Sequence, residues 1–428
     1  MIVPGPLAFS GPVALVGLVL LLGTGCESTG PENSPDVIVR DSAGIRLVRN
    51  AAPDRELPIR EALRIGVVEG EPEFIFHQIR SLALDSTGAV WVSDSHESLR
   101  RYGPGGDYLG KAGGYGPGPG ETTEGYGEIY SGEGTVLAHT YEAVMQLFSL
   151  EGAFLGSRSM VQGPGRYIIP VGKNGEEWNF RIRHIPFTRE KLVREVWILG
   201  RGPADATGFD SLATLPGLFL AGSDPAERGP GSFFYGRPDL KGDADGGFHY
   251  SHAMDYRIER FDGSGSLRQV VTREVSPTPY PGNMEERIID GMREFWREVL
   301  MAGRPPPEDR VRQAAAEAMP ESPPDHLPFS EAIFASARGH IWALRGDRHR
   351  DPAMRAVAEG TGFIRSAWPK EWRSPLHFDL FSPDGIYRGS VVLPEDFVPM
   401  AVSENAIFGS NRDALDVEYV VGYSIGGA

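Results

Sequence analysis

Residues 79–112 read IRSLALDSTGAVWVSDSHESLRRYGPGGDYLGKA and contain four short apolar runs. The runs are rich in β-branched and aromatic residues, and the breaks between them carry Gly88 and Gly105-Gly106. Short runs of this composition, bounded by turn residues, are typical of β-strands. The stretch therefore predicts four consecutive antiparallel strands that are joined by hairpin turns.

The same pattern returns along the rest of the chain. Further copies lie at 128–158, 167–199, 239–273, 331–393 and 398–425, and 193–199 (VREVWIL) is expected as the last strand of the 167–199 copy. Four-stranded units that repeat at roughly 40 to 50 residues are typical of propeller blades. One such sheet exposes both faces, and radial packing buries them. The prediction is an all-β, six-bladed β-propeller of four-stranded blades over residues 37–428.

Two apolar segments precede the first copy, at 44–48 and 63–67. We expect at least one of them to join the sheet of the last blade and so close the ring. Closure removes the exposed strand edges that would otherwise pair with other chains.

The extra sequence is concentrated in three expected insertions, at 200–236, 274–326 and 346–374. By this register they all lie on the face that carries the turns between second and third strands, which we call the insertion face. Long loops on a rigid scaffold commonly carry binding function. The insertion face is therefore the candidate binding face.

The insertion at 274–326 has helical character and makes a small helical insertion between blades four and five. Apolar residues recur at three- and four-residue spacings from Met284 to Leu300, which predicts an amphipathic helix that ends at Pro305–Pro307. A second helix is expected to open at Pro306-Pro307 and run through 314–318. The pair could be a lid or partner-docking element, or it could pack on the rim for stability.

The N-terminus is typical of an export signal. Residues 1–25 carry no charged side chain, and 12–22 form an apolar run that is shorter than the roughly 20 residues of a membrane span. Small residues 23–25 precede Cys26, which resembles the bacterial lipobox with Gly23 where Leu is usual. We expect a signal peptide at 1–25, lipidation of Cys26 and a flexible tether at 26–36; a signal anchor or an unlipidated signal peptide are the alternatives.

Several strings resemble one known group of proteins. They are VRDSAGIRLV (39–48), LRIG (63–66), SLALDSTGAVWVSDS (81–95) and RRYGPGGDYLGKAGGYGPGPGE (100–121). In these strings the chain resembles bacterial six-bladed β-propeller lipoproteins related to NHL repeats. The resemblance implies the fold and a location in the bacterial cell envelope, outside the cytoplasm. It does not choose a function, because such folds include both binding modules and enzymes.

Composition excludes one class of partner. The net charge of −16 repels phosphate backbones, so no nucleic-acid partner is expected. The 40% hydrophobic content and seven tryptophans suffice for a packed core.

The residues that follow the second strands should face the central channel on the insertion face. With their close neighbours they form the candidate ligand site: Asp94, His96, Thr140, His252, Asp255, Arg345 and Ser410. Converging Asp, His and Arg side chains can bind a small polar ligand or assist proton transfer. The alternative is that these groups are only solvated.

Other motifs give no catalytic or metal-binding residue. Asp243–Gly247 offers alternate carboxylates, but it lacks the later Glu of a calcium loop and is better interpreted as a hairpin turn. The glycine-rich stretch 113–121 has no following Lys-Ser/Thr, so it does not match a phosphate loop. No cofactor or metal is predicted.

The sequence therefore favours a membrane-tethered, extracytoplasmic binding module for a protein, a peptide or a glycan. The alternative is a metal-assisted hydrolase or lactonase of the six-bladed propeller type. In that class carboxylates hold a divalent ion at the channel mouth, where Arg345 would repel it.

Overall fold

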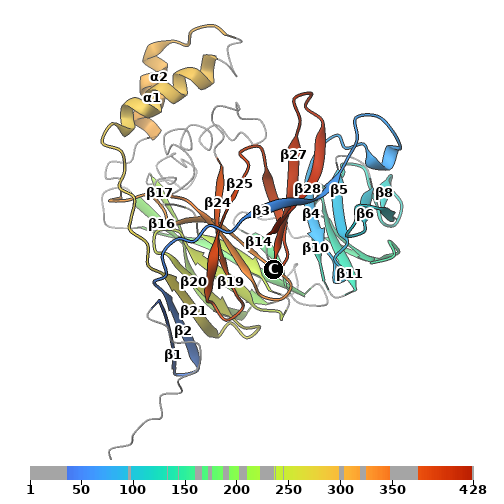
Figure 1. Ribbon diagram of the computed structural model, residues 1–428, viewed down its shortest axis with the longest axis horizontal. Coiled ribbons are helices and arrows are strands. Elements are labelled where there is room, and N and C mark those ends of the chain that lie inside the picture. The colour runs from blue at the N-terminus through green and yellow to red at the C-terminus, as the bar shows by residue number, and fades with distance from the viewer. Residues whose placement is uncertain are drawn as a thin grey trace, which may run out of the picture.

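The computed structural model describes residues 36–94, 98–132, 134–142, 144–159, 166–171, 176–186, 192–201, 210–221, 236, 238–243, 245–297, 303–318, 324–347 and 375–426. Within these ranges the chain is mostly β, with two α-helices (Figure 1). The expected signal peptide, the anchor residue Cys26 and nearly all of the expected tether lie outside the described residues, as do His96 and most of 346–374.

Most strands form antiparallel sheets in which sequential strands are neighbours. The first two sheets are β4(Ile79–Leu84), β5(Val90–Asp94), β6(Leu99–Tyr102), β7(Tyr108–Ala112) and β10(Tyr126–Ser131), β11(Thr135–Thr140), β12(Val144–Ser149), β13(Phe154–Ser159). The next two are β14(Arg166–Val171), β15(Glu176–Pro186), β16(Leu192–Arg201), β17(Asp210–Ala221) and β18(Asp239–Gly242), β19(Phe248–His252), β20(Arg257–Phe261), β21(Leu267–Arg273). The last two are β22(Ser330–Ala335), β23(Ile341–Arg345), β24(Leu376–Phe381), β25(Tyr387–Leu393) and β26(Val398–Val402), β27(Ala406–Arg412), β28(Glu418–Ile425). Each expected copy of the repeat thus corresponds to a sheet.

The sheets contact one another through their first strands. β4 contacts both β10 and β26, and the contacts continue from β26 to β22, from β22 to β18 and from β18 to β14. Apolar clusters fill the junctions: Val90 and Tyr102 pack with Val420 of the last sheet, and Trp342 packs with Ile407. Neighbouring sheets therefore bury the faces that each would expose alone.

The N-terminal strands join two different sheets. β3(Ile59–Ile65) pairs antiparallel with β28, which confirms that a segment ahead of the first copy enters the last sheet. β1(Val37–Ser42) and β2(Ile45–Asn50) form a hairpin, and β2 pairs in parallel with β21 to make a six-stranded sheet. The 44–48 segment therefore extends the fourth sheet and not the last.

The third sheet corrects part of the sequence analysis. The expected insertion 200–236 contains β17, and 193–199 lies in β16, the third strand and not the last. Pro216 argues against a strand at this position in the sequence, because proline is rare inside strands. The ladder between β16 and β17 shifts register beside Pro216, which is how the strand accommodates it.

The expected helices are present as α1(Met284–Phe295) and α2(Glu308–Ala318). α1 ends before the expected Leu300, which lies outside the described residues, and α2 follows Pro305–Pro307 as expected. Their apolar core is built from their own segment, with Ile288 and Phe295 packed against Val311. In Figure 1 the two helices and the β1–β2 hairpin lie at opposite ends of the molecule.

Three short elements complete the described chain. They are the 3-10 helix η1(Pro72–Phe74) and the parallel pair β8(Gly114–Tyr115) and β9(Glu121–Thr122). Inside the glycine-rich stretch the backbone N–H of Gly118 donates to Glu121 Oε2 at 2.9 Å. The Glu121 carboxylate therefore occupies one backbone N–H donor of this loop.

Candidate functional site

The ends of the second strands share one register. Asp94 pairs with Ile79, Thr140 with Tyr126, Arg345 with Ser330 and Ser410 with Val398, and in each pair the partner is the first residue of a first strand. In the fourth sheet Ser251 pairs with Asp239, and His252 follows it. The sequence-predicted residues thus stand at the same end of their sheets, where the chain enters each first strand and leaves each second strand.

Asp94 stabilises the entry into the first strand of its sheet. Its buried carboxylate accepts the backbone N–H groups of His77 at 3.1 Å and Gln78 at 2.6 Å. Arg100 Nη2 lies 3.7 Å from Asp94 Oδ2. Hydrogen bonds and an ion pair inside the protein therefore occupy this carboxylate.

Thr140 and Ser410 are buried, and Asp255 is exposed. The Thr140 hydroxyl accepts the N–H of Val144 at 3.3 Å, across the turn between β11 and β12. This contact lies within the second sheet.

His252 forms a pair with a carboxylate. Its Nε2 lies 3.3 Å from Glu259 Oε2, and the Tyr250 ring packs edge-on with ring centroids 4.7 Å apart. Burial opposes ionisation of Glu259, but the adjacent His252 and the charge of Arg257 hold its pKa below the usual value. His252 and Glu259 are therefore a histidine–carboxylate pair.

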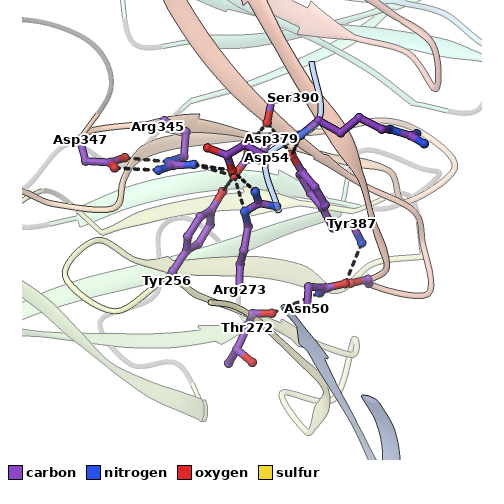
Figure 2. A network of polar contacts seen from close by, with 12 residues as sticks. Asn50, Asp54, Tyr256, Thr272, Arg273, Arg345, Asp347, Asp379, Tyr387 and Ser390 are labelled. Carbon is purple, nitrogen blue, oxygen red and sulfur yellow. Dashed lines mark hydrogen bonds and ion pairs between the residues drawn. The ribbon is translucent and has the colours of Figure 1, made fainter. Parts of the chain in front are cut away.

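Arg345 belongs to a buried ionic network at the junction of the fourth and fifth sheets (Figure 2). Its Nε and Nη2 donate to the two oxygens of Asp347, both at 2.7 Å, and Nη1 lies 3.4 Å from Asp379. Arg273 Nε lies 3.0 Å from the same Asp379 oxygen, and Tyr256 donates its hydroxyl to it. Asp379 and Arg273 have fully buried side chains.

The N-terminal segment takes part in this network. Asp54 pairs with Arg273 and lies 3.7 Å from Arg345, so three carboxylates face two guanidinium groups. Burial opposes the charge of Arg345, yet Asp347 and the other groups around it raise its pKa. Burial and Asp379 raise the pKa of Tyr256 well above its usual value, so its hydroxyl stays protonated and donates. Arg345 is thus committed to holding three segments of chain together.

The Asp243–Gly247 segment is a hairpin turn between β18 and β19, as the sequence indicates. Asp243 Oδ1 accepts the N–H groups of Asp245 at 2.9 Å and Gly247 at 2.8 Å. Its Oδ2 accepts a bond from Arg260 at 3.0 Å. The Asp243 carboxylate, a possible cation ligand in the sequence, is therefore occupied by the backbone of the turn and by Arg260.

Sequence reasoning missed one cluster at the same end of the sheets. Arg80, the second residue of β4, donates to Tyr141 Oη at 2.8 Å and to Gln78 Oε1 at 3.0 Å. The guanidinium lies 5.1 Å from the centroid of the Tyr141 ring, which is 44% exposed. The sequence signal for this cluster is a charged residue at the start of a first strand, whereas the predicted site residues lie at or next to the ends of second strands.

Two features are absent from the described part of the chain. Among the described residues, no three His, Cys, Asp or Glu side chains are grouped so that they could hold a metal ion. No helix within those ranges has the length and apolar character needed to cross a membrane.

The chain matches no protein-family model and no curated protein. It is similar in structure to a protein from Bacteroides fragilis described as exported, with 8% identity, 89% of this chain and 99% of that chain covered, and a TM-score of 0.43. A DUF4221-family member from Bacteroides vulgatus is similar at 6% identity, with 87% and 100% covered and a TM-score of 0.44. The WD40 β-propeller domain of Doa1 is similar at 10% identity, with 86% and 97% covered and a TM-score of 0.35. Because these TM-scores lie below 0.5, we infer function only from the residues of this chain.

Proposed function

We propose that the chain is an NHL-repeat-like, six-bladed β-propeller lipoprotein of the bacterial cell envelope, anchored outside the cytoplasm through Cys26. In this proposal the six sheets are its blades, and its insertion face binds a protein, a peptide or a glycan. The contacts between first strands and the entry of β3 into the last sheet support the ring. The composition of residues 1–26 supports the anchor.

The observation that carries the binding role is the common register of the second-strand ends. It brings the segments after β21 and β23 to the same end as Arg80 and Tyr141. The scaffold beneath is held by the buried Arg273–Asp379–Arg345 network. Variable segments on a rigid sheet scaffold are a common arrangement for recognition.

Glycan and peptide arrays probed with the detergent-purified full chain test this role. One variant replaces 283–318 with a short Gly/Ser linker, and a matched control replaces the Asp262–Ser266 turn at the opposite end of the fourth sheet. We expect the linker variant to lose array signals that the control keeps. Equal signals from both variants would contradict a binding role for the insertion face, and radiolabelled palmitate incorporation that persists in Cys26→Ser would contradict the anchor.

The His252–Glu259 pair favours the second candidate, a metal-assisted hydrolase or lactonase, because a carboxylate-oriented histidine can act as a general base. Lactone and ester hydrolysis by the full chain, with Ca²⁺ or Zn²⁺ added, tests it. Turnover that is lost in His252→Gln would favour the enzyme over the binding module.

A further inference from the structure

Arg80 is held in place before any ligand arrives. It lies on β4 and is half-buried, and it reaches from the first sheet to Tyr141 in the turn that follows β11. Both of its hydrogen-bond acceptors, Tyr141 Oη and Gln78 Oε1, are neutral groups. Its Nε is buried and has no hydrogen-bond partner in the described part of the chain.

Other arginines in this part of the fold are neutralised. Arg100 faces Asp94, and Arg101 lies 2.8 Å from Asp85. No ion pair joins Arg80 to a carboxylate of any described residue. With 58 acidic side chains against 42 basic ones, a half-buried guanidinium that lacks a carboxylate is notable, because desolvated charges are normally paired.

Two described acidic residues at this end of the sheets, Asp94 and Glu142, have partners of their own. Asp94 accepts the backbone groups at 77–78 and faces Arg100. Glu142 accepts hydrogen bonds from Thr122 and Thr123; although burial opposes them, these bonds lower its pKa to about 2. Neither carboxylate is hydrogen-bonded to Arg80.

We propose that Arg80 and Tyr141 form a subsite that binds the carboxylate of a sugar acid. This assignment rests on the proposed binding function and names its ligand class. A carboxylate that takes the place of Gln78 Oε1 gives Arg80 a charged acceptor, and charge-assisted hydrogen bonds are about twice as strong as neutral ones. The half-exposed Tyr141 ring offers an apolar surface beside it for the sugar ring.

The net charge of the protein favours this class over an acidic peptide. A ligand with several carboxylates is repelled by the −16 field, whereas a single carboxylate on a neutral ring meets the local guanidinium at little cost. The subsite therefore suits one anionic group on an otherwise uncharged ligand.

Isothermal titration calorimetry of the full-length protein with glucuronate tests the proposal. Methyl glucoside and acetate are the comparison ligands. We expect saturable binding of glucuronate and at least tenfold weaker binding of the other two. Arg80→Gln should weaken glucuronate binding about tenfold or more, and Arg80→Lys should weaken it less because the charge remains. Arg60→Gln, on the exposed part of β3, is the matched control with the same change in charge and should bind as the wild type does.

The assignment would be overturned if methyl glucoside or acetate bound as tightly as glucuronate, or if a Glu-rich tetrapeptide bound more tightly than glucuronate. It would also be overturned if Arg80→Gln bound glucuronate as tightly as the Arg60→Gln control does. Tyr141→Ala provides a second test away from the strand, and it should weaken glucuronate but not acetate. If array ligands still bind to Arg80→Gln, this subsite is wrong while the binding function stands.

Discussion

His249 makes the stability of the protein depend on pH. The residue lies in β19, its ring is 3% exposed, and its Nε2 has no hydrogen-bond partner among the described residues. It lines a small, mostly apolar cavity between the fourth and fifth sheets with Ile258, Ile341 and Phe381. Burial lowers the pKa of His249 to about 4 from 6.5; Asp243 opposes this shift and Arg260 adds to it.

The sign of the effect follows from which state binds the proton. Above pH 6.5 the ring is neutral in both states, so the histidine contributes no pH dependence there. As the pH falls from 6.5 towards 4, the unfolded chain takes up a proton and the folded chain does not, so stability is lost. At about 1.36 kcal/mol per pKa unit, the loss reaches about 2–3 kcal/mol at pH 4.5 and about 3 kcal/mol below pH 4.

Urea unfolding of the wild type and of His249→Gln at pH 8.5, 7.5 and 4.5 measures this loss. The difference in unfolding free energy between the two proteins should be the same at pH 8.5 and 7.5. It should then move by about 2–3 kcal/mol in favour of the variant at pH 4.5. Because both proteins carry the same carboxylates, the change in their difference with pH reports on the imidazole that His249→Gln removes. A difference that is unchanged at pH 4.5 would refute the reasoning.

Three further substitutions test the attachment of the N-terminal segment. Asn50→Leu removes three hydrogen bonds, to Thr272, Gly385 and Tyr387, of which the last two are buried, and should lower the unfolding free energy by about 2–3 kcal/mol in urea; an unchanged midpoint would contradict this. Gly389→Ala places a Cβ 2.7 Å from Leu57 at a φ of +138°, so hydrogen exchange at 54–58 should accelerate in a protein that stays folded, and wild-type protection there would argue against the contact. Asp379→Ala removes the carboxylate that Arg345 and Arg273 share, and it should lower the unfolding free energy by about 3–5 kcal/mol in urea. A decrease below 1 kcal/mol would show that the network adds little to stability.

The sequence predicted the strand units well because their signals are local. In 79–112 the apolar runs and the glycines between them specify each strand and turn without reference to the rest of the chain. The helices at 284 and 308 were found for the same reason, since the spacing of their apolar residues and the prolines between them lie within one segment.

Contacts between distant segments could not be predicted in this way. Asp54, Arg273 and Asp379 are far apart in the sequence, and no local pattern shows that a segment ahead of the first repeat will meet the fourth and fifth sheets. Both N-terminal apolar segments look alike as extended strands, so only their packing decided that one joins β21 and the other β28. Arg345 was therefore expected as a free group at a channel mouth, whereas it lies within an ionic network.

The β1–β2 hairpin determines how the protein responds to a pull on its N-terminus. Among the described strands, β1 pairs only with β2, and its first residue, Val37, pairs with Asn50 at the open end of the hairpin. Tension applied ahead of Val37 would load the six residue pairs one after another, as in a zipper, and not all at once as in shear. The hairpin would open at low force, and β1 would then add its length to the N-terminal tether. β2 would stay paired with β21, and the sheets behind it would stay intact.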